Sequence, residues 1–439
     1  MVTRTNITEF FEKYNKNLEQ EEMLNEALYK TTDQEAWMEC LREKARELRR
    51  MYVENEAMLN LYLRPFVHRE KRLVPETAEE FLKQLSIQSE NGNADRLVCI
   101  QMGTELYRYY EELGERDKMI KVAHRLGNFH SQYENYVDAE LSLFYYEIER
   151  SYVGDYLNID SWEIRKSILF AHYNYAIVLV NSRAKYHNVG QGYDEAYQNE
   201  ILKDVDRAVA LFEDPQVRAL DGERYDLDGL REELLYDVFG NWVCGSDSGQ
   251  DMSPALMQRA DEVLTELYRS ALEKEESYYD IRDEIYCNYW KIRFFTGDID
   301  LHEYEERVSD FCMHVIENGG FDENENELFV DSRYFQINMY HYPNIASVVK
   351  ANDGSAEHME ALKKKILPQF LHFVEELPKS TRVPFVNGGL QRTMTDLALA
   401  FGTDAIDTTF LLPRGARTRA EECGPCQSGQ KRVSVEYVA

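Results

Sequence analysis

Glycine and proline are both scarce in this chain, with 22 and 10 residues among 439. Because these residues supply most turns and linkers, little of the chain can be loop or low-complexity linker. No run of about 18 apolar residues occurs, so no segment is long and apolar enough to span a membrane. The N-terminal segment also lacks the apolar core of a secretion signal, which predicts a cytoplasmic protein.

Motifs that usually mark catalysis are missing as well. The sequence has no glycine-rich phosphate loop, no H-E-x-x-H zinc motif and no adjacent His-Asp pair. The acidic run from Asp322 to Glu327 resembles a calcium loop only loosely, because it lacks the glycine at the sixth position. We therefore predict a protein that is not an enzyme, with no catalytic residue, no metal and no cofactor.

Basic charge is also in deficit. The chain has 80 acidic and 50 basic side chains, a formal net charge of -30. A field of this sign repels phosphate backbones and anionic lipid, so we predict no nucleic-acid partner and no membrane partner. High solubility is the simplest consequence of this charge.

The seven cysteines form an odd, scattered set, which favours reduced thiols in a cytosolic compartment. Cys423 and Cys426 form a C-x-x-C pair, the spacing of many redox sites. A thioredoxin-like site would need a strand before the pair and a helix after it, and neither pattern is present. We interpret the pair as an incidental feature of the C-terminal tail, with a redox-active tail as the alternative.

Helical periodicity dominates what is present. Residues 34–64 predict one long helix that Pro65 ends, and Tyr340 to Pro343 predict a turn. The other predicted helices are 94–113, 116–133, 137–153, 160–182, 192–212, 227–239, 252–274, 278–296, 300–317, 355–376 and 384–402.

Several joints between helices share one chemistry. Gly114 and Gly297 each follow a helical pattern, and each is followed by an acidic residue at the next helix start. Glycine ends a helix by accepting the left-handed backbone conformation, and an acidic residue favours the next N-terminus. Two further segments, each with a small alanine that permits close packing, look like starts of second helices: Asn135–Ala139 and Gly192–Ala196.

These joints predict an all-α chain, a degenerate tetratricopeptide-like helical-repeat solenoid with a disordered C-terminal tail. Helix lengths vary too much for a strict repeat. The predicted units are N-terminal helices, tetratricopeptide-like repeats, further helical repeats and the tail, at residues 1–65, 66–240, 252–410 and 411–439.

Aromatic residues crowd two of the predicted helices. In helical repeats the inner helices line a concave groove, where Tyr, Asn and His side chains contact a ligand. The alternative is that these side chains pack between repeats. The predicted groove-lining residues are His172, Tyr173, Asn174, Tyr286 and Tyr289.

The chain resembles the tetratricopeptide-like N-terminal region of clostridial-type bacterial signalling proteins over roughly residues 40–400. The resemblance is carried by Tyr52–Glu56, Leu63–Val67, Glu76–Phe81, Asp95–Leu97, Leu113–Lys118 and Arg125–Gly127. In that family an HD-type phosphohydrolase domain or a GGDEF domain usually follows, so the resemblance implies that residues 252–410 also contain the lead-in to a missing output domain. Neither pattern occurs in this sequence, so the resemblance predicts no catalytic residue. The helical periodicity of the sequence stops after about Phe410.

Two functional hypotheses follow. The first is a non-catalytic binding and regulatory module that recognises a peptide, a partner protein or a small ligand. The second is an HD-type phosphohydrolase or a diguanylate-cyclase-type protein that lacks its catalytic domain. The sequence leaves the ligand, the parent output domain and the oligomeric state open.

Overall fold

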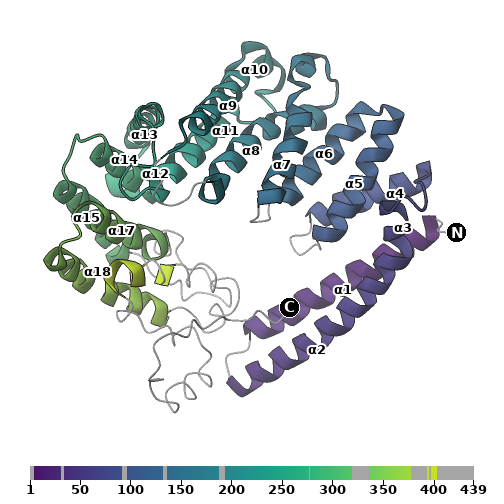
Figure 1. Cartoon of the computed structure of the whole chain (residues 1–439), viewed down its shortest axis with the longest axis horizontal. Coiled ribbons are helices and arrows are strands. Elements are labelled where there is room, and N and C mark those ends of the chain that lie inside the picture. The colour runs from purple at the N-terminus through teal and green to yellow at the C-terminus, as the bar shows by residue number, and fades with distance from the viewer. Residues whose placement is uncertain are drawn as a thin grey trace.

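A computed structural model describes residues 4–30, 34–90, 96–131, 136–186, 193–275, 277–318, 336–376, 393–394 and 397–402. Every regular element within these ranges is a helix, which confirms the all-α prediction. The predicted tail, residues 411–439, lies outside the described residues. The helices follow an open arc from the long α1–α2 hairpin to α15, α17 and α18 at the other end (Figure 1).

The N-terminal part consists of the α1–α2 hairpin and the helices that pack beside its base. Its elements are α1 (Arg4–Lys30), α2 (Gln34–Met58), the π-helical turn η1 (Leu59–Leu63), α3 (Arg64–Val67) and α4 (Pro75–Glu90). The prediction that Pro65 ends the long helix is wrong. Pro65 occupies the first turn of α3, where a missing backbone N–H costs little, and the helix runs on to Val67.

The middle of the arc is a run of helices in which each contacts the next. These elements are α5 (Arg96–Leu113), α6 (Arg116–Ser131), α7 (Tyr136–Arg150), the 3₁₀ turn η2 (Val153–Asn158), α8 (Trp162–Tyr186), α9 (Glu195–Glu213) and α10 (Pro215–Asp221).

The C-terminal part continues the same packing of helix on helix. Its elements are α11 (Leu227–Leu235), the π-helical turn η3 (Tyr236–Gly240), α12 (Asn241–Gly245), α13 (Pro254–Lys274), η4 (Tyr278–Asp280), α14 (Asp283–Phe295), α15 (Leu301–Asn318), η5 (Ile337–His341), α17 (Tyr342–Asn352) and α18 (Ala356–Glu376). The turn predicted at Tyr340 to Pro343 is wrong, because Pro343 lies in the first turn of α17.

The two glycine joints form as predicted. Gly114 has a φ of 68°, and the amide of Glu115 donates to the carbonyl of Tyr110 at 3.0 Å. Gly297 has a φ of 82°, and the amide of Asp298 donates to the carbonyl of Arg293 at 3.0 Å. Both are the backbone pattern that satisfies the last carbonyls of a helix and requires a left-handed residue.

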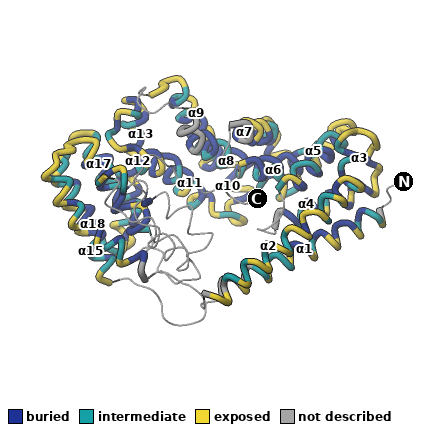
Figure 2. Tube along the Cα trace, turned by 60° about the horizontal axis from the view of Figure 1, so that its bottom comes forward, coloured by how far each residue is buried: buried dark blue, intermediate teal, exposed yellow. Residues whose placement is uncertain are grey.

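Buried apolar side chains form a core that runs along the arc. One cluster extends from α1 to α7, and a larger one extends from α6 to residue 400. Packing is therefore continuous across residues 65–76 and 240–252, where the predicted units meet. Along each helix, buried and exposed residues recur in turn (Figure 2), which is the pattern of helices that bury one stripe against neighbours.

Glycine also sets the approach of helices in the middle of the arc. A Cβ atom on Gly127 of α6 would lie 2.5 Å from the ring of Tyr146 on α7. That ring is buried, and its hydroxyl donates to the Oδ1 atom of Asn128 at 2.7 Å, so it cannot move aside. The absence of a side chain at Gly127 therefore allows α6 and α7 to pack closely.

Gly127→Ala is expected to lower the free energy of unfolding by about 1–3 kcal/mol, because overpacking outweighs the better helix propensity of alanine. Urea unfolding of the two proteins would measure the difference. Gly154→Ala is the control, since a Cβ atom there meets nothing within 4 Å. Equal midpoints for Gly127→Ala and Gly154→Ala would show that the close approach is not constrained.

Candidate functional site

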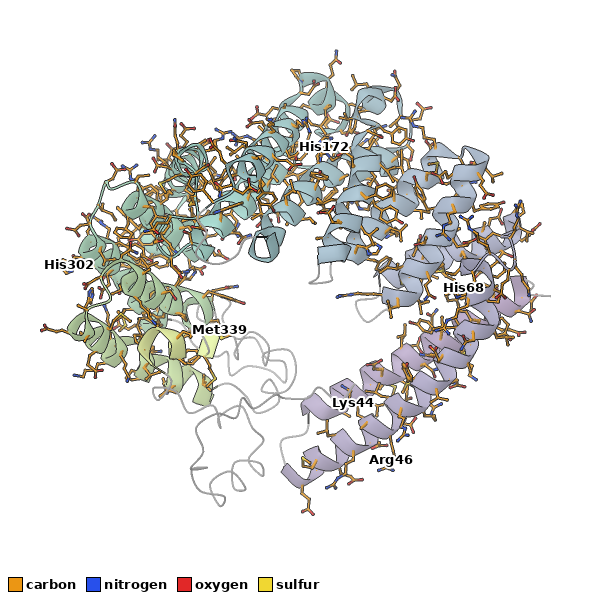
Figure 3. The ribbon with its side chains drawn as sticks, in the orientation of Figure 1. Lys44, Arg46, His68, His172, His302 and Met339 are labelled. Atoms are coloured by element: carbon orange, nitrogen blue, oxygen red, sulfur yellow. The ribbon has the colours of Figure 1, made fainter. Side chains whose placement is uncertain are left out.

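Three of the predicted groove residues lie on α8, and the first of them is buried. His172 is 6% exposed, and neither ring nitrogen has a hydrogen-bond partner among the residues that the structure describes. Burial lowers the pKa of His172 to about 3, and the nearby charges of Arg150 and Arg207 act in the same direction. His172 is therefore neutral, and Figure 3 shows it among the helices in the middle of the arc. The labelled basic residues Lys44 and Arg46 lie far from it, on the hairpin.

A buried ion pair lies beside His172 and links two helices. Arg150 at the end of α7 donates to Asp204 of α9 at 2.5 Å, and both side chains are nearly inaccessible. The guanidinium also lies 3.8 Å from the ring centre of Tyr175. The charged groups of Arg150 and Asp204 therefore contact one another at the packing interface between helices.

Tyr173 and Asn174 are partly exposed but are also committed to contacts. The Tyr173 hydroxyl donates to the carboxylate of Asp237 in η3. The Asn174 amide lies 3.5 Å from the Oδ1 atom of Asn128, which is longer than an ordinary hydrogen bond. Both residues join α8 to neighbouring helices.

The other two predicted residues lie on α14, about a turn apart. Tyr286 is 3% exposed and stacks on Phe311 of α15 with ring centres 4.2 Å apart. Tyr289 is half-buried and stacks on Tyr268 of α13 at 4.0 Å. The aromatic crowding on α14 thus joins three successive helices.

The structure does not bring the five predicted residues together. His172 and Tyr286 are buried between helices, which favours for these two the alternative of packing between repeats. For Tyr173, Asn174 and Tyr289, which retain partial exposure, a ligand-binding role stays a prediction.

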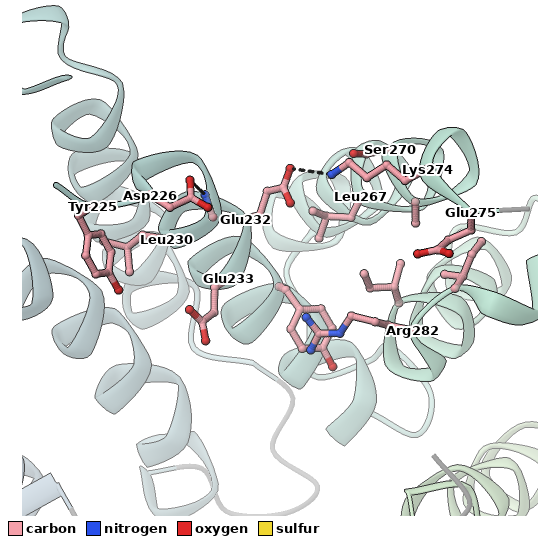
Figure 4. Close-up of a pocket in the computed structure, with 15 residues that line it drawn as sticks. Tyr225, Asp226, Leu230, Glu232, Glu233, Leu267, Ser270, Lys274, Glu275 and Arg282 are labelled. Atoms are coloured by element: carbon pink, nitrogen blue, oxygen red, sulfur yellow. Dashed lines mark hydrogen bonds and ion pairs between the residues drawn. The ribbon is translucent and has the colours of Figure 1, made fainter. Parts of the chain in front are cut away.

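A pocket of about 600 Å³ lies elsewhere, between α11, α13 and the start of α14 (Figure 4). This volume falls within the range of small-ligand sites, about 300–1,000 Å³. Its floor is apolar and consists of side chains from all three helices: Leu230, Tyr236, Leu267, Ala271, Ile281 and Ile285.

Charged groups surround this floor, and most of them are acidic. The four carboxylates are Asp226, Glu232, Glu233 and Glu275, and the two cations are Lys274 and Arg282. Figure 4 shows Glu232 and Lys274 facing one another from α11 and α13, with 3.7 Å between Nζ and Oε1. The pocket therefore has more negative than positive charge around an apolar surface.

The π-helical turn η3 positions the tyrosine at the base of the pocket. Tyr236 is 8% exposed, and its ring lies against Gly240, where a Cβ atom would be 2.8 Å from it. The guanidinium of Arg282 lies 4.9 Å from the ring centre, within the range of a cation–π contact. Burial raises the pKa of Tyr236, so the phenol stays protonated and can donate a hydrogen bond.

None of the pocket residues was singled out from the sequence. Leu227, Leu230 and Leu234 follow a helical stripe, which indicates a buried face but no pocket. The acidic residues gave no signal, because they are four among 80. These four carboxylates differ from the other solvated ones only because three helices bring them together around one pocket.

No model of a known protein family matches the chain, and no curated protein matches it either. Within the described ranges, no three His, Cys, Asp or Glu side chains gather in a way that could hold a metal ion. None of the helices described is long and apolar enough to cross a membrane.

Proposed function

We propose that the chain is a non-catalytic binding module, built from degenerate tetratricopeptide-like helix pairs, that recognises a segment of a partner protein. The pocket between α11, α13 and α14 is the proposed binding site. A regulatory role in a bacterial signalling protein is part of the proposal, and it rests on the sequence resemblance alone.

Helix packing in the middle of the arc supports the repeat architecture. The helices α5 to α9 pack each on the next, which is how helix-turn-helix repeats bury their apolar stripes. Gly103 and Gly127 permit close approach on successive helices, since a Cβ atom on Gly103 would lie 2.8 Å from Leu126. Ala139, at the start of a predicted second helix, is 5% exposed and takes part in the same packing.

The observation that carries the proposed function is the pocket. The floor side chains are 0–9% exposed, except for the half-buried Ala271, and a ligand that enters the pocket covers the apolar surface that they still present. The surrounding carboxylates and the hydroxyl of Tyr236 can fix the orientation of a polypeptide segment.

Ala271→Trp tests this assignment, because the indole would fill the pocket from α13. Short random peptides displayed on phage would be selected against the full wild-type chain and then measured on the variants. We expect the selected peptides to lose about tenfold or more in affinity for Ala271→Trp. Leu272→Trp is the matched control, since Leu272 is 42% exposed and does not line the pocket.

Both tryptophan variants would be checked for equal urea midpoints. If Ala271→Trp fails to fold, Ser270→Leu narrows the pocket from the preceding position and gives the same comparison. Selected peptides that bind Ala271→Trp and Leu272→Trp with equal affinity would place the binding site elsewhere. Failure to select any peptide would contradict a peptide-binding role.

A further inference from the structure

We infer that the ligand of this pocket is a polypeptide segment that carries a lysine or arginine side chain beside an apolar one. The inference rests on the proposed function and specifies the chemistry of the partner. It follows from which charges around the pocket are already paired, and which are not.

Both cations of the pocket have an acidic neighbour. Lys274 pairs with Glu232, and the Nε atom of Arg282 lies 3.6 Å from Oε2 of Glu284. Arg282 additionally covers one side of the Tyr236 ring. Neither cation is therefore available as the main contact for an anionic ligand.

Within the described residues, Glu232 is the carboxylate of the pocket that pairs with a cation, and the other three make no ion pair. Glu233 and Glu275 are exposed side chains, and neither makes an ion pair within the described part of the chain. Asp226 differs, because its carboxylate caps α11 by accepting from the amide of Gly229 at 2.9 Å. Glu233 on α11 and Glu275 at the end of α13 thus present unneutralised charge from two walls of the pocket (Figure 4).

The position of Glu275 strengthens the local field. It is the residue that ends α13, where the unpaired carbonyl groups carry partial negative charge. A cation that approaches Glu275 meets its carboxylate and this helix end, whereas Glu233 lies on the other side of Arg282 (Figure 4). An anion that approaches Glu275 would be repelled by both the carboxylate and the helix end.

The apolar floor makes a purely ionic ligand a poor fit. A hydrated inorganic cation would make no use of the small apolar surface that Leu267, Ala271 and Ile285 still present to the pocket. A side chain such as leucine covers this floor, while the long stem of a neighbouring lysine or arginine reaches the rim.

A third feature is the unused polar group at the base. The hydroxyl of Tyr236 has no hydrogen-bond partner among the residues that the structure describes, although the side chain is 8% exposed. A backbone carbonyl of a bound segment can accept from this hydroxyl. A polypeptide supplies the carbonyl, the apolar side chain and the cation together, which favours it over a small amine.

Fluorescence polarisation with the full chain tests the inference. The probes are three fluorescein-labelled peptides of alternating leucine and a variable residue, which is lysine, citrulline or glutamate. We expect the lysine peptide to bind most tightly and the glutamate peptide most weakly. Added salt should weaken the lysine peptide, because screening acts on exposed charges.

The net charge of the whole chain requires a control, since -30 attracts any basic peptide to some extent. The double variant Glu233→Gln/Glu275→Gln removes two charges from the pocket. Glu111→Gln/Glu112→Gln removes the same number from exposed positions on α5. We expect the pocket variant to weaken the lysine peptide by roughly three- to tenfold and the α5 variant to leave it nearly unchanged.

Arg282→Gln should change the affinity for the lysine peptide in the opposite direction. It removes a competing cation from Tyr236 and from the pocket, so the lysine peptide should bind about two- to threefold more tightly. Equal effects of the pocket and α5 double variants, or tighter binding of the glutamate peptide, would overturn the inference. The proposed function would survive that result if phage-selected peptides still lost affinity for Ala271→Trp.

Discussion

Asp221→Asn should lower the free energy of unfolding by about 3–5 kcal/mol, because it leaves a buried guanidinium without its counter-charge. The Asp221 carboxylate is 0% exposed and accepts from Nε and Nη2 of Arg165 at 2.8 and 2.7 Å. It also accepts from the hydroxyl of Tyr156 at 2.9 Å. Asparagine can satisfy only part of this arrangement and carries no charge.

The remaining donor of Arg165 holds the guanidinium in its buried position. Nη1 donates to the carbonyls of Ile159 and Asp160 at 2.6 and 3.1 Å. The side chain therefore connects η2, α8 and α10 at one point, and it stays buried when its partner is replaced. Loss of Asp221 should loosen all three elements together.

A surface pair of the same chemistry provides the control. Asp228 accepts from Arg218 at 2.6 Å, but its side chain is 74% exposed, so water replaces the contact when Asp228 is changed to Asn. Urea unfolding would compare the two variants, and hydrogen exchange would show whether α8 and α10 lose protection. Similar, small effects of Asp221→Asn and Asp228→Asn would contradict a structural role for the buried pair.

A double variant separates loss of the pair from loss of packing. Asp221→Leu/Arg165→Met removes both charges, so no uncompensated charge stays buried. We expect it to be more stable than Asp221→Asn, as is found when apolar side chains replace a buried ion pair. The pair then matters because breaking it is costly, rather than because forming it is favourable.

Local signals predicted the helices of the arc well. Gly114 and Gly297 end helices for a reason that depends on one residue and its neighbours, namely the left-handed backbone. Asp194 precedes α9 and accepts from the amide of Tyr197 at 3.1 Å, which is the expected use of a residue at a helix start. Features of this kind need no knowledge of the rest of the chain.

Local signals failed where a helix continues through a residue that usually ends one. Pro65 and Pro343 each follow a π-helical turn and occupy the first turn of a new α-helix. The wider turn restarts the hydrogen-bond pattern, so the proline is placed where its missing N–H has no partner to lose. The short helix α10 and the helix α17 were not predicted for the same reason, since proline stands at the start of each.

Side-chain burial was harder to predict than helix position. Ala139 and Ala196 occupy equivalent places in two similar segments, yet Ala139 is buried and Ala196 is exposed. His172 and Tyr286 were expected in a groove, but neighbouring helices cover them. A helical pattern gives the period of the buried stripe, whereas the helices that cover it are fixed only in three dimensions.

The pocket illustrates the same limit at larger scale. Its walls come from α11 and α13, and Arg282 precedes α14, so residues from 225 to 285 converge on one place. No short spacing marks this convergence. The unpaired charge of Glu233 and Glu275 is a property of their neighbours in space, and the sequence contains 80 similar carboxylates.

The second large effect concerns Glu149 on α7 and depends on pH. Its carboxyl is 0% exposed, and Oε2 lies 2.9 Å from Nδ1 of His124 on α6. Within the described part of the chain, Oε1 has no hydrogen-bond partner. Burial raises the pKa of Glu149 from 4.5 to about 7, although the contact with His124 acts in the opposite direction. The folded chain therefore holds this proton more tightly than the unfolded chain does.

The sign of the effect follows from that difference. Between pH 4.5 and about 7 the folded state binds more protons at Glu149 than the unfolded state, so stability falls as pH rises. The stabilising contribution is complete below pH 4.5 and is lost as pH rises through about 7, a total of about 3 kcal/mol. Glu149→Gln has no proton to lose, so this decline should be absent.

Urea unfolding at several pH values from 5 to 8 would measure Glu149→Gln against wild type, with the difference between them as the quantity of interest. The difference cancels the titration of the other acidic side chains, which the net charge of -30 makes large. We expect the two proteins to be similarly stable at pH 5 and the variant to be more stable by about 2–3 kcal/mol at pH 8. Glu111→Gln, at an exposed position on α5, should show no such trend. A difference that stays constant across this range would mean that Glu149 does not hold its proton in the folded chain, and that water or His124 solvates the charge at the α6–α7 contact.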